Sequence, residues 1–200
     1  MRIIDYKSSV KSINLNEVLA GLQLQLLTYL DATCKEQEML PAGVFYFNLI
    51  EPMINANSEM AEEQIKEELR KQFRMQGLIL LDTQIVRKMD TTLTTGKSNI
   101  VDVTIKKEGE VSEKANTLNS RQFENLQKYM DKIIKQIAEE ILSGNIGIEP
   151  YYKVQSKKTP CDYCSYKSIC QFNKTTRNDY KYIPNLSKEA VLEKINEESK

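Results

Sequence analysis

Alternating apolar and polar side chains near the N-terminus predict a β-strand from Arg2 to Lys7. Successive side chains of a strand point to opposite faces of the sheet. Asp5 and Lys7 therefore share one face with Ile3, and Tyr6 lies on the other face. The pattern predicts a carboxylate and an ammonium group that point in the same direction.

After a polar connection, apolar residues at a spacing of four predict a helix over residues 17–32, with Asn16 as its cap. The expected buried stripe of this helix consists of Val18, Leu22, Leu26 and Leu30. A nearly continuous apolar run from Gly43 to Ile50 predicts a central strand that is covered on both faces. Strand, helix and strand together predict a βαβ-like unit.

Two later helices have clear end signals. A surface helix is expected between Ser58, its cap, and Gly77, its stop, because acidic residues come early in this segment and basic residues late. A long helix is expected from Asn119 or Ser120 to Gly144. Its apolar positions keep helical spacing, namely Phe123, Leu126, Met130, Ile133 or Ile134, Ile137 and Ile141.

The remaining segments are shorter. Residues 99–116 predict a pair of strands around Gly109. Beyond Pro150 the chain becomes loop-like, basic and rich in cysteine. The last sixteen residues, 185–200, fit either a short terminal helix or a partly disordered tail.

Composition narrows the possible functions. The 200 residues suffice for one domain with a real core, and 28 basic side chains balance 28 acidic ones. Without a global positive field, any nucleic-acid binding must come from a local patch. No apolar run approaches the roughly 20 residues that span a bilayer, and the N-terminus lacks the features of a secretory signal. We therefore expect a cytoplasmic protein.

The sequence contains no histidine. Ser-His-Asp and Cys-His catalysis are excluded, and so are histidine-dependent zinc sites. Asp5 and Lys7 nevertheless suit a metal-dependent phosphodiesterase, in which a carboxylate holds Mg²⁺ and a lysine orients water or offsets charge on the phosphate. Gln25 and Tyr29 are four residues apart and share one helix face. Each of these pairs also occurs by chance, as a solvated ion pair or at the margin of a packed helix.

Three of the four cysteines, Cys161, Cys164 and Cys170, fall within ten residues. This clustering favours a metal site over disulfides in a chain without a secretory signal. A structural site needs four ligands, and the fourth cysteine, Cys34, is far away in the sequence. Spacing alone leaves zinc and an iron–sulfur cluster open.

Taken in order, these motifs resemble the RecB-like branch of the PD-(D/E)XK nucleases. The strings "RIIDYKSS", "GLQLQLLTYLD", "FRMQGLILLD", "VRKMDTTL" and "PCDYCSYKSICQF" are similar to the C-terminal nuclease domain of AddB-type proteins. These proteins are part of bacterial ATP-dependent helicase–nucleases that process double-strand DNA breaks. A Cas4-like nuclease shares the catalytic and cysteine pattern but matches the middle strings less well.

The resemblance implies an α/β fold, a partial restriction-endonuclease-like core with a mixed sheet, flanking helices and a cysteine-rich C-terminal clasp. Residues 1–150 would form the nuclease core, residues 151–178 the iron–sulfur segment and residues 179–200 a tail. The implied partners are DNA and an AddA-type helicase–nuclease subunit.

The resemblance also implies roles for the site residues. Asp5 corresponds to a Mg²⁺ ligand, the backbone carbonyl of Tyr6 to a further ligand, and Lys7 to the catalytic lysine. Gln25 and Tyr29 correspond to a helix motif that positions the lysine and the DNA.

By the same resemblance, Cys161, Cys164 and Cys170 correspond to three ligands of a [4Fe–4S] cluster. Members of the family carry a further metal-binding aspartate and another cluster cysteine earlier in the chain. We therefore expect the C-terminal part of a longer protein, catalytically incomplete, with the fourth cluster ligand outside this chain. The alternative of a different class is a non-catalytic, zinc-bearing module for DNA binding or subunit docking.

Overall fold

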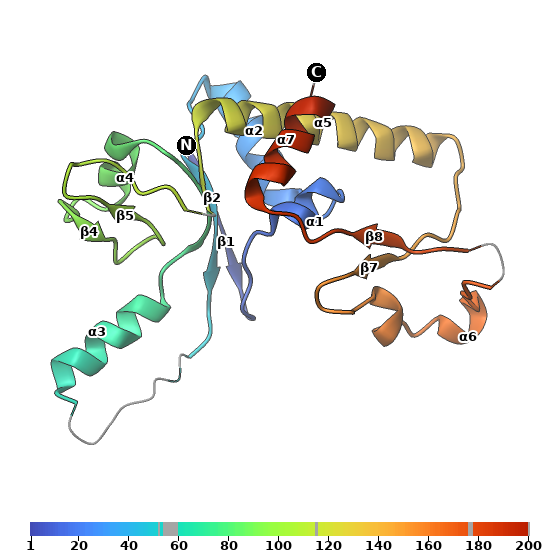
Figure 1. The fold of residues 1–200 in the computed structure, drawn as a ribbon, viewed down its shortest axis with the longest axis horizontal. Helices are drawn as coiled ribbons and strands as arrows, with labels where there is room; N and C mark the ends of the chain where they lie inside the picture. Colours follow the sequence, from blue (N-terminus) through green and yellow to red (C-terminus); the bar gives the residue numbers. More distant parts are fainter. Residues whose placement is uncertain (52, 54–59, 115, 176–177, 200) are drawn as a thin grey trace.

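The computed structural model describes residues 1–51, 53, 60–114, 116–175 and 178–199. Its central sheet has the strand order β1-β2-β3-β6 (Figure 1). β1 and β2 are parallel, β3 is antiparallel to β2, and β6 is parallel to β3. The strands are β1 Arg2–Lys7, β2 Gly43–Asn48, β3 Gln76–Leu80 and β6 Thr117–Leu118. This mixed sheet with flanking helices confirms the predicted α/β class.

The two strands predicted first are confirmed. β1 has the predicted bounds, and β2 ends at Asn48, two residues before the predicted end. β2 is covered on both faces, because Val44 and Tyr46 belong to one hydrophobic cluster and Phe45 to another. The alternation of side chains therefore assigns each residue of β2 to one of two cores.

β3 is a strand that the sequence pattern did not predict. Gly77, the expected helix stop, lies inside this strand. A Cβ at Gly77 would lie 1.9 Å from the carbonyl oxygen of Val44, so the glycine lets the backbones of β2 and β3 approach closely. The preceding helix, α3, spans Glu62–Gln72 and buries none of its residues, as predicted for a surface helix. Its expected cap, Ser58, lies outside the described residues.

The single helix predicted over residues 17–32 is wrong, because two helices occupy this region. α1 spans Leu15–Leu19 and α2 spans Gln25–Gln37. Between them, Gly21 (φ 82°) and Gln23 (φ 55°) adopt left-handed conformations, which end a right-handed helix. Asn14 rather than Asn16 is the cap, since its side chain accepts a hydrogen bond from the Asn16 amide.

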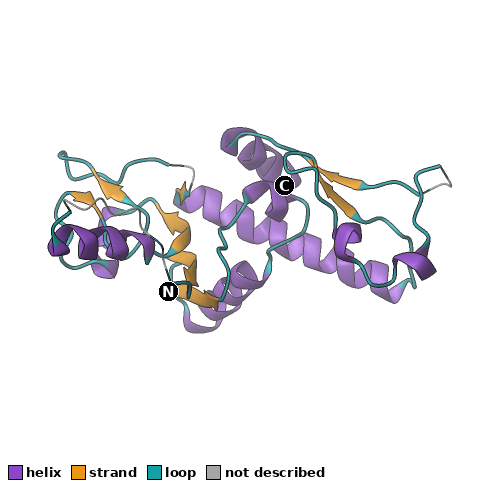
Figure 2. Ribbon diagram, turned by 90° about the horizontal axis from the view of Figure 1, so that it is seen from below, coloured by secondary structure: helices purple, strands orange, loops and turns teal. Residues whose placement is uncertain are grey.

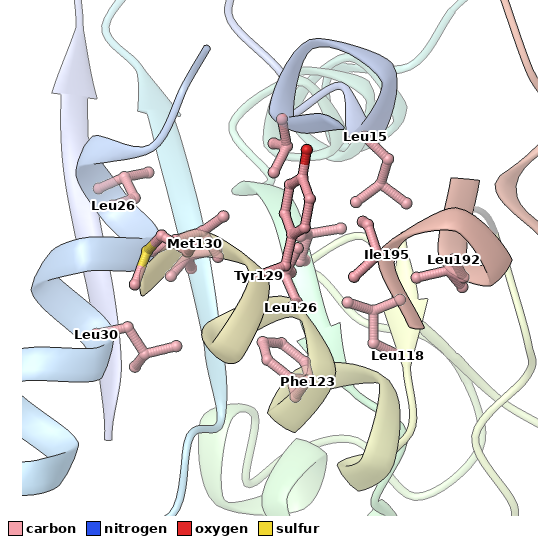
Figure 3. Packing of buried hydrophobic residues seen from close by; sticks show 14 of the residues in the cluster. Leu15, Leu26, Leu30, Leu118, Phe123, Leu126, Tyr129, Met130, Leu192 and Ile195 are labelled. Carbon is pink, nitrogen blue, oxygen red and sulfur yellow. The ribbon is translucent and has the colours of Figure 1, made fainter. Parts of the chain in front are cut away.

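Four helices cover one face of the sheet: α1, α2, α5 (Ser120–Leu142) and α7 (Lys188–Glu198). Figure 3 shows their side chains meeting around Leu126 and Met130 of α5. The expected cap of α5 is confirmed, since Asn119 and Gln122 bond to each other's backbone amides. α7 confirms the terminal helix, and its residues Val191 and Ile195 are fully buried.

The opposite face of the sheet is covered by a smaller layer. It contains α4 (Thr83–Met89), β4 (Gly96–Lys97) and β5 (Thr104–Ile105), which pack around Phe45. Gly109 forms a turn at φ 88°, but only a single bridge, from Ile105 to Val111, follows that turn. β5 pairs mainly with β4, so the predicted strand pair around Gly109 is only partly present.

The cysteine-bearing segment is more ordered than the predicted loop. β7 (Tyr151–Lys153) and β8 (Lys181–Ile183) form a parallel two-stranded sheet, and the cysteines lie between them. The connection contains a 3₁₀ helix, η1 (Pro160–Tyr163), and the short helix α6 (Lys167–Cys170). Figure 2 shows this unit, here called the cysteine lobe (residues 151–183), at the opposite end of the molecule from β4 and β5. In the described part of the chain, no helix combines the length and apolarity needed to cross a membrane.

Candidate active site

Asp5 and Lys7 lie together on the helix-covered face of β1. Ile3, which shares their face of the strand, packs against the hydrophobic cluster formed with α2. Lys7 Nζ lies 2.7 Å from Asp5 Oδ2, and both side chains are about one-third exposed or less, at 32% and 27%. β1 is an edge strand of the described sheet. The predicted juxtaposition of carboxylate and ammonium group is therefore present at the sheet edge.

The charge state of this pair is set by its close contact. Contact with Asp5 raises the pKa of Lys7 above its ordinary value, although partial desolvation opposes the shift. Lys7 therefore stays positively charged at neutral pH. Asp5 Oδ2 is itself a buried atom, and among the described residues it accepts no hydrogen bond of regular geometry.

The donor chemistry of Asp5 fits a hard cation. A carboxylate oxygen that lacks a hydrogen-bond donor is suited to bind Mg²⁺. Within the described residues, however, no three acidic or cysteine side chains are grouped closely enough to hold a metal ion. The Tyr6 ring points to the opposite face, where it is 64% exposed and contacts Phe47 edge-on at 5.7 Å. Any contribution of Tyr6 to a metal site must come from its backbone.

Tyr46 is a site residue that the sequence analysis missed. It lies directly beside Asp5 in the β1–β2 register, and its ring centroid is 5.6 Å from Lys7 Nζ. Burial raises the pKa of the Tyr46 hydroxyl, and the charge of Lys7 opposes that shift. Tyr46 stands inside the apolar run of β2, so only the strand register, which sequence alone did not supply, reveals that it faces the Asp5–Lys7 pair.

Gln25 and Tyr29 share one face of α2, as predicted. Gln25 Nε2 donates a hydrogen bond to the Tyr29 hydroxyl at 3.3 Å, and both side chains are exposed. α2 packs against β1, the strand that carries the catalytic candidates. Within the described structure, neither side chain hydrogen-bonds to Asp5 or Lys7. The pair therefore lies on the neighbouring helix and is organised by its own contact.

The three clustered cysteines are reduced and lie in the cysteine lobe. Cys161 is half-buried in η1, while Cys164 and Cys170 are exposed. Thiols are suitable ligands for zinc or an iron–sulfur cluster, so the donor types fit. The described side chains are not gathered into a metal-binding group. Cys34 lies in the core cluster, where burial raises the pKa of its thiol, so it behaves as a packing residue.

Comparison with known proteins identifies the family to which this arrangement belongs. Residues 1–171 match the model of the PD-(D/E)XK nuclease superfamily. The chain belongs to this superfamily. An edge strand carrying Asp5-x-Lys7 beside a packed helix is accordingly the nuclease-superfamily part of the fold.

Individual relatives share a more specific name. The chain is 39% identical over its whole length to the ATP-dependent helicase/deoxyribonuclease subunit of Bacillus subtilis (strain 168). It is 40% identical, over 92% of its length, to the subunit of the same name from Acetivibrio thermocellus, and 40% identical over its whole length to that of Alkaliphilus oremlandii. The chain spans only 16–18% of the length of these relatives. All three names denote the AddB-type protein, so they agree with that resemblance rather than with a Cas4-like nuclease.

Proposed function

We propose that this chain supplies the Asp5–Lys7 part of an active site that hydrolyses DNA phosphodiester bonds in a helicase–deoxyribonuclease. The observation that carries the proposal is the 2.7 Å contact between Lys7 Nζ and Asp5 Oδ2 on an edge strand of a nuclease-superfamily fold. The names of the relatives support DNA as the substrate and a helicase as the working partner.

In this proposal each residue of the pair has one role. Asp5, with the backbone carbonyl of Tyr6, is the holder of Mg²⁺, which supplies Lewis-acid chemistry for the attacking water when bound. Lys7 acts as a fixed positive charge, because its raised pKa keeps the ammonium group protonated. Such a charge offsets the negative charge that grows on the phosphate. Tyr46 limits the motion of Lys7 by packing its ring beside the ammonium group.

The exposed pair on α2 has a supporting role in the proposal. Gln25 and Tyr29 present an amide and a hydroxyl group from the helix that packs against β1. These groups are suited to hydrogen-bond a phosphate or sugar of bound DNA. Their mutual hydrogen bond holds them ready for that contact.

The cysteine lobe completes the proposal. We assign Cys161, Cys164 and Cys170 as three ligands of a [4Fe–4S] cluster whose fourth ligand comes from outside this chain. The proposal is supported by the spacing of three reduced thiols within ten residues and by the core location of Cys34. The whole assembly would act in the cytoplasm, with an AddA-type subunit, in the processing of double-strand DNA breaks.

The chain alone is proposed to be catalytically incomplete. Mg²⁺ demands near-octahedral oxygen coordination, and one carboxylate is a weak anchor for it. We therefore expect no metal-dependent DNA cleavage by purified 1–200 in Mg²⁺ or Mn²⁺.

Binding of Mn²⁺, followed by electron paramagnetic resonance, tests the metal role without requiring turnover. The chain should bind the ion weakly, and Asp5→Asn should reduce that binding further, while the matched change Asp102→Asn in a partly exposed loop should leave it unchanged. Equal Mn²⁺ binding by the Asp5→Asn protein would remove Asp5 from the proposed site.

A further inference from the structure

The cysteine lobe is strongly basic although the whole chain is neutral. Its described residues include six lysines and only two aspartates, Asp162 and Asp179. Three of the lysines, Lys157, Lys158 and Lys167, are exposed and make no ion pair with any described residue. Unpaired lysines on one small unit form a local positive patch, which is the electrostatic requirement for contact with a polyanion.

Two tyrosines of the lobe are much more exposed than folding requires. Tyr163 is 82% exposed at the end of η1, and Tyr166 is 69% exposed just before α6. Lys167 follows Tyr166 directly, so ring and charge alternate along the surface. Rings this exposed contribute little to the core, but their faces are available to a planar ligand.

The aromatic residues behind this surface form a rigid support. Tyr152, Tyr180 and Tyr182 lie on one face of β7 and β8, with ring centroids 5.3–6.2 Å apart. Phe172, two residues after Cys170, joins them at 4.8 Å from Tyr180. Lys174 Nζ lies 5.0 Å from the Tyr180 centroid and 4.9 Å from that of Tyr182. The segment that bears the exposed tyrosines is thus anchored independently of any metal.

The opposite face of the same strands attaches the lobe to the nuclease core. The Tyr151 hydroxyl donates to the Ala20 carbonyl at 2.8 Å, and Lys153 Nζ lies 2.7 Å from Glu17 Oε1. Ile183, on that same face, is buried. Because side chains alternate along a strand, the lobe has one docking face and one outward aromatic face.

We propose that the cysteine lobe binds single-stranded DNA, with bases stacked on Tyr163 and Tyr166 and phosphates held by Lys157, Lys158 and Lys167. The proposal rests on the proposed function only for the choice of DNA. Exposed aromatic rings interleaved with lysines match the chemistry of an unpaired strand, whose bases are free to stack. A duplex hides the faces of its bases and would meet only the lysines. Binding of this kind is independent of base sequence.

The test is equilibrium binding to purified 1–200, measured by fluorescence anisotropy in EDTA and a reducing agent. The probes are a labelled single strand of deoxythymidines, a mixed-sequence single strand, a duplex and an RNA strand of equal length. The two DNA single strands should bind about equally and more tightly than the duplex. The Tyr163→Ala/Tyr166→Ala double variant should bind the single strands about tenfold more weakly or worse.

Three control variants separate stacking from other effects. Tyr163→Phe/Tyr166→Phe should bind like the wild type, because the ring is retained. Ile169→Ala, at a neighbouring position that is 79% exposed, should also bind normally. Lys157→Gln/Lys158→Gln should lower the slope of log K against log salt by about 1.4, since each phosphate contact in a single strand contributes about 0.7.

Several outcomes would overturn the proposal. They are no binding at low salt, a preference for the duplex, tighter binding of RNA than of DNA, normal binding by the double alanine variant, or equal losses in the phenylalanine and alanine variants. If circular dichroism shows the double alanine variant unfolded, the single variants Tyr163→Leu and Tyr166→Leu decide in its place. A Lys7→Ala chain should bind normally, so a failed nuclease assignment leaves this result unaffected.

Discussion

Lys153 Nζ lies 2.7 Å from Glu17 Oε1, and this contact joins β7 of the cysteine lobe to α1 of the nuclease core. Glu17 also accepts a hydrogen bond from Gln23 Nε2 at 3.1 Å, in the left-handed turn that separates α1 from α2. The Glu17 side chain is 15% exposed. One carboxylate therefore organises both the helix break and the attachment of the lobe.

Replacement of Glu17 should loosen the lobe. We predict that Glu17→Ala lowers the free energy of unfolding by about 1–2 kcal/mol, because a largely buried contact and two hydrogen-bond donors lose their acceptor. Limited proteolysis should then cut residues 151–183 faster than in the wild type. The matched change Glu124→Ala, which removes the exposed α5 pair with Lys128, should do neither. Unchanged proteolysis of the Glu17→Ala chain would refute the attachment.

A second carboxylate, Asp90, organises the loop that follows α4. The residue is 2% exposed and accepts hydrogen bonds from the Ser98 hydroxyl at 2.7 Å, the Thr92 hydroxyl at 2.7 Å, and the amides of Thr92 and Asn99. Burial alone would raise the pKa of Asp90, but these hydrogen bonds outweigh it and lower the pKa below its ordinary 3.8. Asp90 belongs to the string "VRKMDTTL" that carried part of the family resemblance.

The lowered pKa makes this part of the stability pH-dependent. The unfolded chain protonates Asp90 first, so the contribution is complete well above pH 3.8 and is lost as the pH falls through 3.8 towards the folded pKa. Asp90→Asn should cost about 2 kcal/mol at pH 7. Urea unfolding between pH 3 and 7 should show a smaller loss on acidification in Asp90→Asn than in the wild type. Parallel pH curves for the two proteins would contradict the assignment.

Gly77 provides a test of the β2–β3 pairing. A methyl group at this position would lie 1.9 Å from the Val44 carbonyl oxygen, a backbone atom that has no freedom to move away. Gly77→Ala should therefore destabilise the chain by about 3 kcal/mol or more. The control Gly109→Ala, at φ 88° but with open space around its Cβ, should cost about 1 kcal/mol. Similar urea midpoints for the two variants would mean that β2 and β3 do not pair as described.

The sequence predicted the elements whose signals are local. Period-two alternation was enough for β1, and the reciprocal Asn119–Gln122 cap was enough for the start of α5. The break between α1 and α2 was missed because the spacing of four, from Val18 through Leu22 to Leu26, continues across two left-handed residues. A hydrophobic pattern does not record backbone handedness, so it predicted one helix.

The missed elements depend on contacts between distant segments. β3 was overlooked because a glycine reads as a helix stop until the close approach of Val44 is known. Tyr46 could not be placed beside Asp5 without the β1–β2 register. β7 and β8 pair across the whole cysteine connection, so neither strand is long enough to be recognised alone. Asp5 and Lys7 were predictable because their juxtaposition requires only one strand.

The cysteine assignment makes a prediction about metal content. After anaerobic reconstitution with iron and sulfide, the chain should retain iron below the four atoms per chain of a complete cluster, because it offers three clustered thiols. Single Cys161→Ser, Cys164→Ser and Cys170→Ser changes should lower the iron content further. Cys34→Ser should not, because Cys34 packs in the core. Stoichiometric zinc in the purified chain, or iron that depends on Cys34, would contradict the assignment.

The central claim is that Asp5 and Lys7 belong to a nuclease active site, and one cleavage measurement tests it most directly. The matched segment of the Bacillus subtilis relative would be replaced by this chain, and the chimera assayed with its partner subunit on linear DNA in Mg²⁺. We predict that Lys7→Ala lowers the cleavage rate at least 100-fold and leaves ATP hydrolysis unchanged, since only the charge near the phosphate is lost. Cleavage by the Lys7→Ala chimera at the rate of the unmodified chimera would contradict the account.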